Sequence, residues 1–537
     1  MTINLLINCM IFLVFFSALP VIVLFAQFLL VGLHGLFNHY SKCRLYTPRV
    51  TVIVPAWNEG NVLGNAVDML MALDYPKENI RICVVDDDST DHTPEVLKAK
   101  AKQYPDKVFH VRRENGGQGK AHTLNSGLEF VLSDNWAEAI LIMDADVLFE
   151  PQSLGKMTRH LADPEVGAIT AYIKEGQIPG NIITRFIAYE YIAAQAASRR
   201  SQNVLGVLAC LAGGAQLHTR SNIERIGGKI NTSTLAEDTY TTFETQLHKY
   251  KVIFEGNAIV KAEEPETITD LWKQRFRWSR GNIQITHAFR KVWFHPSTRL
   301  GGWFFDLMWF CITLMPFFMI LGSIGLVTLF FIDQTKSWAL FRTLGGVSAA
   351  VYLFITLYSY FIDSETSKRA WAQAIMFPGL ISVFLLAVSF APNLFEQSMK
   401  TIFGADNYNY AQSIFLLFTS LWLSMCMFFA WLIYRLDRAG MSRRVNNFLL
   451  LLVGYGPFLC AITLAACMAE LRHFQPKWDK TEKLGKVKIR ELSSYQSLSF
   501  EESLTQDIQK ERRLFWQELL VFLLILVLFS LRYYFEF

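Results

Sequence analysis

The chain has 537 residues, of which 52% are hydrophobic, and its formal net charge is +4. This length exceeds one ordinary domain, and the apolar content is too high for a plain soluble enzyme. The small net charge excludes a strongly basic nucleic-acid-binding surface, so we expect no nucleic acid among its partners. The eight cysteines form no Cys-x-x-Cys pair, which argues against a zinc site or a disulfide framework.

Residues 1–41 contain no Asp, Glu, Lys or Arg. Because about 20 apolar residues span a bilayer, they predict an N-terminal transmembrane segment, either one long tilted helix or a hairpin broken near Pro20. Their length and the lack of a basic start argue against a signal peptide. Lys42, Arg44 and Arg49 follow directly, which predicts that this end of the segment faces the cytosol.

Residues 45–265 have the mixed composition of a globular domain, in which short apolar runs alternate with turn-like or helix-like sequence. This alternation is typical of βαβ units and a largely parallel sheet. We therefore predict an α/β domain whose ligands bind beyond the carboxyl ends of the strands. The predicted strands are Val50–Val54, Ile80–Val85, Val108–Val111 and Ala139–Met143.

Acidic residues follow the second predicted strand, where Asp86 and Asp87 precede a third aspartate. Carboxylates at a strand tip could accept hydrogen bonds from a nucleotide base and ribose. Adjacent carboxylates repel each other, so a ligand or a cation should compensate them. The alternative is an acidic turn that caps the next helix.

The sequence Asp144-Ala-Asp146 follows the fourth predicted strand. In an extended chain, side chains two residues apart point the same way, so both carboxylates can face one Mg²⁺ or Mn²⁺ ion, which in turn can hold a diphosphate. Lys120 lies in the glycine-rich segment 115–122, whose backbone N–H groups could approach phosphates. Its spacing excludes a P-loop, and a simple turn before a helix is the alternative.

Two later motifs supply catalytic candidates. Glu237 and Asp238 are adjacent carboxylates, and Asp238 could be the general base that deprotonates an acceptor hydroxyl, although helix capping explains the pair equally well. Gln274, Arg277 and Trp278 share one face of a helix. They offer an amide, a guanidinium for a leaving diphosphate and an aromatic platform for a sugar. An amphipathic interfacial helix within residues 266–300 would use the same residues.

The remainder of the chain is apolar again, and we expect transmembrane helices in residues 304–470 and 514–537, separated by a polar, basic segment at 471–513. If every span crosses, the basic segment lies outside, against the positive-inside tendency. One span is therefore a candidate for an interfacial or re-entrant segment, and Pro378 and Gly379 favour the third. The expected spans are Phe304–Ile332, Leu344–Ile362, Trp371–Phe390, Ile414–Tyr434, Phe448–Ala469 and Leu519–Leu531.

The acidic strand tip, Asp-x-Asp, Ala-Glu-Asp and Gln-x-x-Arg-Trp motifs, in this order, resemble a processive, inverting family 2 glycosyltransferase. That family includes cellulose, hyaluronan, chitin and poly-N-acetylglucosamine synthases. The resemblance covers about residues 50–284. It implies an α/β GT-A (Rossmann-like) catalytic domain, cytosolic and embedded in an α-helical transmembrane bundle, which binds a UDP-sugar with Mg²⁺ or Mn²⁺.

The resemblance also assigns roles to residues. Asp86 and Asp87 would contact the uridine, Asp146 would coordinate the metal beside Asp144, and Asp238 would be the base. A small-residue loop, 212–215, would lie beside the acceptor. The implied nucleotide-sugar-binding residues are Pro55, Asn58, Glu59, Asp86, Asp87, Lys120, Asp144, Gln274, Arg277 and Trp278.

Residues 199–202 and 278–281 resemble the poly-N-acetylglucosamine type of synthase, which implies polymerisation of UDP-N-acetylglucosamine. The resemblance also implies the growing glycan and the lipid bilayer as partners, with accessory membrane or periplasmic subunits as further candidates. A cellulose- or hyaluronan-type product is an alternative. Single-sugar transfer to a polyprenyl phosphate is another, against which the Gln-x-x-Arg-Trp motif and the many later spans count. A nucleotide-regulated transporter is the distant alternative. The spans contain almost no charged residues, which counts against it, since ion-coupled transporters usually need such residues at the midplane.

Overall fold

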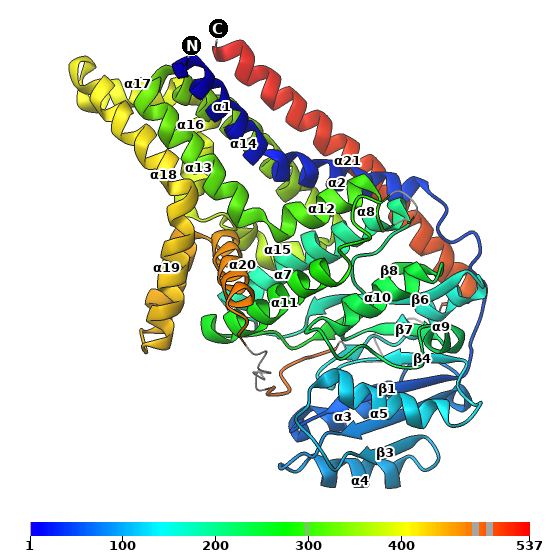
Figure 1. Cartoon of the computed structure of the whole chain (residues 1–537). Helices are drawn as coiled ribbons and strands as arrows, with labels where there is room; N and C mark the ends of the chain where they lie inside the picture. Colours follow the sequence, from blue (N-terminus) through cyan, green and yellow to red (C-terminus); the bar gives the residue numbers. More distant parts are fainter. Residues whose placement is uncertain (1, 296–297, 299, 475–482, 490–497, 537) are drawn as a thin grey trace.

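The computed structural model describes residues 2–295, 298, 300–474, 483–489 and 498–536. Two regions are stacked on one another: an α/β domain built on one sheet, which spans residues 50–288, and a bundle of long helices that holds both ends of the chain (Figure 1). The predicted combination of an α/β domain and a helical bundle is thus confirmed.

The α/β domain contains a sheet of eight strands in the order β3-β2-β1-β4-β7-β6-β8-β5. The four predicted strands are confirmed, and β3, β2, β1 and β4 run parallel. The other half departs from the parallel expectation, because β7 is antiparallel to both of its neighbours and β5 is antiparallel to β8. The strands are β1 (Val50–Ala56), β2 (Ile80–Asp86), β3 (Val108–Arg112), β4 (Ala139–Ile142), β5 (Leu148–Phe149), β6 (Val166–Glu175), β7 (Gln216–Thr219) and β8 (Lys251–Ala262).

Helices cover both faces of the sheet, which is why the parallel strands read as continuous apolar runs. Side chains alternate along a strand, so Val52 packs into one core and Ile53 into another, which Leu124 of the helix after β3 also lines. The helices of this domain are α3 (Gly60–Met71), α4 (Thr93–Gln103), α5 (Lys120–Leu132), α6 (Ser153–Thr158), α7 (Ile182–Tyr191), α8 (Ser198–Leu205), α9 (Arg220–Arg225), α10 (Glu237–Leu247) and α11 (Ile268–Ala288), with shorter turns at Lys77–Asn79, Arg159–Ala162 and Ile192–Ala197.

Among the described residues, five helices are long and apolar enough to cross a membrane, or up to seven if each of two bent helix pairs counts as one span. The segment Ile3–Leu36 is one of the five, so the long helix is found and the hairpin is not. The helices outside the α/β domain are α1 (Thr2–Ser17), α2 (Leu19–Leu36), α12 (Trp303–Thr313), α13 (Met315–Ile332), α14 (Gln334–Ile362), α15 (Ser364–Ile375), α16 (Leu380–Phe390), α17 (Pro392–Phe403), α18 (Ala405–Arg438), α19 (Arg443–Val453), α20 (Tyr455–Leu471) and α21 (Phe500–Glu536).

Two expected spans are broken. The third bends by 80° between α15 and α16, at the Pro378-Gly379 position favoured from the sequence, and the fifth bends by 93° between α19 and α20. Gly379 and Gly454 have φ of 89° and 107°, a left-handed region that suits glycine. The two breaks also touch, since a Cβ on Gly379 would lie 2.4 Å from the carbonyl carbon of Val453. The bends therefore come from paired glycines as well as from proline.

Part of the basic segment packs on the α/β domain. Lys488 N donates to Gly176 O at 3.1 Å, and Val487 forms an antiparallel bridge with Gln177. Residues 483–489 thus pack on the α/β domain. They would lie on the same side of a membrane as that domain if one span is interfacial or re-entrant, as the sequence analysis allowed. The broken helices supply the physical reason, because a bent pair need not traverse the bilayer. Residues 475–482 and 490–497 of the segment lie outside the described residues.

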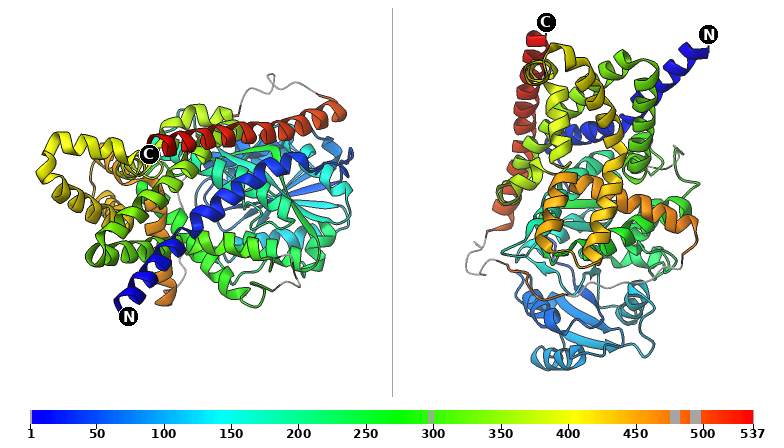
Figure 2. Two further views of the ribbon diagram at one scale, coloured as in Figure 1. Left: turned by 90° about the horizontal axis from the view of Figure 1, so that it is seen from above. Right: turned by 90° about the vertical axis from the view of Figure 1, so that its left-hand side faces the viewer.

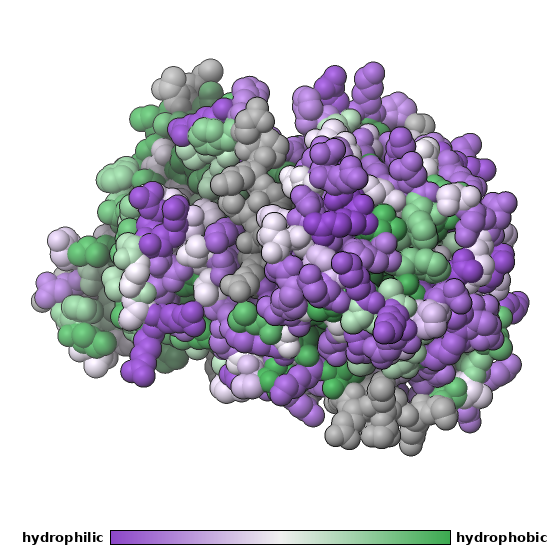
Figure 3. Space-filling model, turned by 90° about the horizontal axis from the view of Figure 1, so that it is seen from below, coloured by the Kyte–Doolittle hydropathy of each residue, from purple (hydrophilic) through white to green (hydrophobic). Residues whose placement is uncertain are grey.

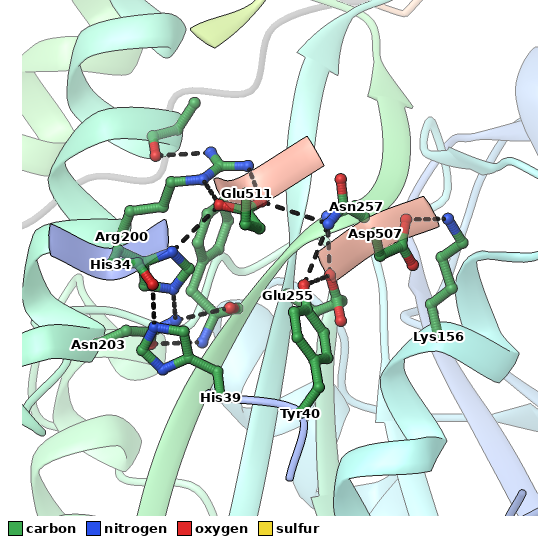
Figure 4. Close-up of polar contacts among 12 residues, drawn as sticks. His34, His39, Tyr40, Lys156, Arg200, Asn203, Glu255, Asn257, Asp507 and Glu511 are labelled. Atoms are coloured by element: carbon green, nitrogen blue, oxygen red, sulfur yellow. Dashed lines mark hydrogen bonds and ion pairs between the residues drawn. The ribbon is translucent and has the colours of Figure 1, made fainter. Parts of the chain in front are cut away.

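A buried ionic network joins the bundle to the sheet (Figure 4). Glu511 of α21 accepts from Arg200 Nε at 2.8 Å and lies 3.1 Å from His34 Nδ1 of α2. Asp507, one turn earlier on α21, pairs with Arg159 Nη2 at 2.8 Å. Helices α2 and α21 lie side by side where they meet the α/β domain (Figure 2). The face of the α/β domain away from the bundle is mostly hydrophilic, while hydrophobic residues gather over the bundle helices (Figure 3).

Candidate active site

The predicted site residues gather at one edge of the sheet, where the carboxyl ends of the parallel strands meet. Pro55 lies near the end of β1 and Asn58 in the loop after it, β2 ends at Asp86, and Asp144 follows β4. Ligands of open α/β sheets bind at such an edge. Residues up to 89 positions apart in the chain are therefore neighbours for a topological reason.

Two arginines compensate the acidic strand tip. Asp86 is fully buried and accepts from Arg112 Nη1 at 2.6 Å, and Arg113 pairs with Asp87. Gly117 N also donates to Asp87 Oδ2 at 3.0 Å, so the predicted glycine-rich loop does meet the acidic tip. The sequence analysis predicted that a ligand or a cation compensates these carboxylates, but it did not identify the two arginines. The register could have done so, because Arg112 lies opposite Asp86 at the end of the neighbouring strand.

The loop after β1 is shaped by its own polar side chains. Asn58 has a positive φ of 54°, which asparagine tolerates well. Its Oδ1 accepts from Thr90 N at 2.8 Å and from Asp91 N at 3.2 Å, and Glu59 N donates to Thr93 Oγ1 at 2.9 Å. These bonds tie the β1 loop to the β2 loop, so Asn58 and Glu59 help build the wall of the predicted nucleotide pocket rather than project freely into it.

Lys120, at the first position of α5, is the centre of a carboxylate cluster. Its Nζ lies 2.5 Å from Asp144 Oδ1 and 3.5 Å from Glu237 Oε1, and it donates to Gly213 O at 3.2 Å. Burial alone would lower the pKa of Lys120, but the two carboxylates outweigh it and raise that pKa. Desolvation raises the pKa of Asp144 and of Glu237, and Lys120 opposes this. The ammonium therefore holds together groups that would otherwise repel each other.

Asp146 has a different cation as its partner. Lys483 Nζ lies 2.6 Å from Asp146 Oδ2, and both side chains are largely enclosed. The backbone around Lys483 is fixed by Glu263, which accepts from Leu484 N and Gly485 N, each at 2.8 Å. Burial would lower the pKa of Lys483, but Asp146 and other nearby carboxylates outweigh it and raise that pKa. Sequence reasoning missed this contact because Lys483 lies more than 300 residues from Asp146, with no local signal.

Asp238 lies in the first turn of α10 and faces the small-residue loop. A Cβ on Gly213 would lie 3.1 Å from Asp238 Oδ2 and 3.2 Å from Lys120 Nζ, so only a glycine leaves both groups room. Helix α11 reaches the same place, because a Cβ on Gly281 would lie 2.7 Å from Ala236 Cβ. The structure thus brings the Ala-Glu-Asp and Gln-x-x-Arg-Trp motifs into contact.

Of the three predicted α11 residues, Trp278 is the most open, with 39% of its surface exposed. Arg277 is close enough to Glu237 to oppose the rise of its pKa. Gln274 Nε2 donates to Glu264 Oε2 at 3.3 Å, and Arg275 Nη1 donates to Gln274 Oε1 at 2.8 Å. Arg277 therefore lies near the carboxylate cluster, and Gln274 and Trp278 on the same helix add the amide and the indole that suit a sugar diphosphate.

The donor set suits a hard divalent cation. Asp144 and Asp146 are carboxylates at the end of one strand, and each already holds a lysine ammonium, so the position attracts positive charge. Within the described residues, no group of three or more His, Cys, Asp or Glu side chains forms a complete metal cage. The aspartates could thus supply two ligands, with the remainder from a diphosphate and water, which is how Mg²⁺ is usually bound beside phosphates.

Comparison with known proteins agrees with this geometry. Residues 48–281 match the family described as "Glycosyltransferase like family 2". That range runs from β1 through the Gln-x-x-Arg-Trp helix and includes every predicted site residue. Residues 48–281 therefore carry a domain that matches family 2 glycosyltransferases, and this match supports sugar transfer as the activity of the domain.

Curated relatives are named as glycosyltransferases. Probable glycosyltransferase YdaM of Bacillus subtilis is 27% identical over 433 residues, 75% of this chain and 99% of that protein. A β-monoglucosyldiacylglycerol synthase of Synechocystis is 32% identical, covering 51% of this chain and 55% of the relative. Poly-β-1,6-N-acetyl-D-glucosamine synthase of Staphylococcus aureus is 27% identical, covering 44% and 55%. The chain thus spans about half the length of the last two relatives.

Among solved structures, the mannosyltransferase PcManGT from Pyrobaculum calidifontis, in complex with GDP-Man and Mn²⁺, is similar with a TM-score of 0.47. It is 22% identical in sequence, and the match covers 70% of this chain and 98% of that one.

Proposed function

We propose that this protein is a processive, inverting glycosyltransferase that polymerises a UDP-sugar, UDP-N-acetylglucosamine in the first instance, into a β-linked polysaccharide and passes it through the helical bundle. One observation carries the proposal. The acidic tip, the Asp-x-Asp, Asp238 and the Gln-x-x-Arg-Trp helix meet at a single edge of the sheet, and α11 packs directly against the broken helix α20. A relative named as a poly-N-acetylglucosamine synthase supports the choice of sugar.

In this reaction the acceptor hydroxyl oxygen attacks C1 of the donor sugar, and the bond from C1 to the diphosphate oxygen breaks. Asp238 takes the hydroxyl proton, and the departing UDP keeps the electron pair, so an α-linked donor gives a β-linked product. A bound Mg²⁺ or Mn²⁺ on Asp144 and Asp146 would neutralise charge on the diphosphate. Arg277 would add a guanidinium to the same task.

The other residues bind and orient. Asp87 would accept hydrogen bonds from the uridine, held in place by Arg113 and Gly117. Lys120 keeps Asp144 and Glu237 together and close to Asp238. Trp278 would stack on the terminal acceptor sugar, because an exposed indole face suits the apolar face of a pyranose ring.

We further propose that the α/β domain is cytosolic, where UDP-sugars are found. The residues after α2 include Lys42, which pairs with Asp163 on the α/β domain at 3.1 Å. A suitable reporter position is Glu129, on the exposed side of α5. A Glu129→Cys variant in a Cys9→Ser background should resist an impermeant thiol reagent in intact cells and react in lysed cells. Labelling in intact cells would reject this orientation.

A glycolipid product is the second candidate, favoured by the relative named as a β-monoglucosyldiacylglycerol synthase. The deciding experiment gives the purified protein, in lipid nanodiscs that contain diacylglycerol, a panel of radiolabelled UDP-sugars. Label in a water-soluble product that a specific glycosidase degrades supports polymerisation. Label in a chloroform-soluble lipid supports glycolipid synthesis, and no incorporation from any UDP-sugar refutes both.

A further inference from the structure

Arg275 lies within the Gln-x-x-Arg-Trp motif but is not one of its three defined positions, and the mechanism above gives it no role. Its side chain is only 4% exposed, on the face of α11 that packs inward. The Nη1 atom donates to Gln274 Oε1 at 2.8 Å, and the guanidinium lies 4.1 Å from the centroid of the Trp278 ring. One buried side chain thus supports both the amide and the aromatic platform of the motif.

Arg275 is itself held from another helix. Its Nη2 donates to Glu190 Oε2 of α7 at 2.8 Å. The same carboxylate oxygen accepts from the hydroxyl of Tyr455 at 2.6 Å. A buried arginine that loses a partner has little water to replace it, so Glu190 has a strong influence on where the guanidinium lies. The position of Trp278 therefore depends on Glu190, and through it on Tyr455.

Tyr455 stands at the break between α19 and α20. It is the first residue of α20, directly after Gly454, and its ring is fully buried. The ring stacks on Phe186 with centroids 5.2 Å apart and an interplanar angle of 7°, and it also contacts Phe377 at 5.4 Å. Phe377 belongs to the other break, where its carbonyl accepts from Gly456 N at 2.9 Å. Any relative shift of the two broken helices must therefore move the Tyr455 hydroxyl.

We propose that Arg275 is the positioning residue for the acceptor platform, and that Tyr455 of the broken helix α20 sets its position through Glu190. The contact between the two membrane breaks then determines where Trp278 and Gln274 hold the acceptor end. A lysine cannot substitute, because it lacks the planar fork that stacks on an indole while donating in two directions. This inference rests on the proposed function and deepens it at the acceptor site.

The test uses Arg275→Lys and Tyr455→Phe in the full-length protein, with UDP-N-acetylglucosamine as donor and a β-1,6-linked N-acetylglucosamine tetramer as added acceptor. Tyr455→Phe removes one hydroxyl with almost no change in volume. The matched control is Tyr434→Phe. Tyr434 of α18 stacks on Trp272 of α11 with ring centroids 4.1 Å apart, and its hydroxyl accepts from Arg438 Nη1 at 3.4 Å. Donor KM, acceptor KM, kcat, UDP affinity and product length are measured for each.

Both variants should raise the acceptor KM or shorten the product several-fold, while donor KM and UDP affinity stay normal and Tyr434→Phe behaves as the native protein. A purely structural role would lower only the amount of active protein, which scales kcat and leaves acceptor KM and product length unchanged. That pattern, or native behaviour of both variants, overturns the inference. No product from the native protein would instead refute the proposed function, and the inference with it.

Discussion

Lys483 occupies the side of Asp146 where a metal ion is expected, and the two should compete. The change Lys483→Met keeps the length of the side chain and removes the ammonium, which lies 2.6 Å from Asp146 Oδ2. A hydrogen bond between charged groups contributes about 1.5–3 kcal/mol. Since about 1.4 kcal/mol is a factor of ten in an equilibrium constant, the apparent affinity for Mn²⁺ should rise roughly 10- to 100-fold.

The assay counts free Mn²⁺ by electron paramagnetic resonance during titration of the native protein and the variant, with and without UDP. Lys486→Met is the matched control, because Lys486 belongs to the same segment but pairs with Glu266 at 2.7 Å, away from Asp146. Removal of divalent ions with a chelator should abolish sugar transfer by the native protein. Equal Mn²⁺ affinity for the native protein and Lys483→Met, or full transfer in chelator, would refute this reasoning.

Four further predictions concern the base, the nucleotide pocket, the buried network and pH. Asp238→Asn should bind UDP normally yet transfer sugar about 10²–10⁴-fold more slowly, and a normal rate would place the base elsewhere. Asp87→Asn should weaken UDP binding itself in a calorimetric titration; unchanged affinity would remove Asp87 from the pocket. Arg200→Met should cost about 3–5 kcal/mol in stability, because Glu511 keeps its buried charge, and a native Tm would contradict this. Burial lowers the pKa of His160, but hydrogen bonds to Cys43 and to a buried glutamate outweigh it and raise that pKa from 6.5 to about 9. The charged form therefore stabilises the fold fully below pH 6.5, and Tm should fall as pH rises toward 9; a Tm that rises over this range would exclude the assignment.

The strands and their carboxyl-end site could be predicted because the signals are local. Apolar runs bounded by turns mark β1, β2, β3 and β4, and the topology rule for parallel sheets then places whatever follows them at one edge. Asp86 and Asp144 were predicted in this way, and Asp238 was predicted from the Ala-Glu-Asp motif, each from residues within a few positions of itself. The break at Pro378-Gly379 was likewise favoured from the sequence, since both residue types disturb a helix locally.

Contacts between distant segments could not be predicted in the same way. Nothing near Lys483 in the sequence indicates Asp146, and nothing near Tyr455 indicates Glu190. The break at Gly454 was missed, although Gly454, Gly456 and Pro457 lie within four positions, because the apolar residues on both sides predict one continuous span. Its bend is decided by the close approach of Gly379 from another helix. Hydrophobic pattern and residue type thus determined the elements and the chemical groups of this protein. The pairing of buried charges and the packing of backbones against each other were decided only in the tertiary structure. Such contacts depend on distance in space and leave no periodic signal along the chain.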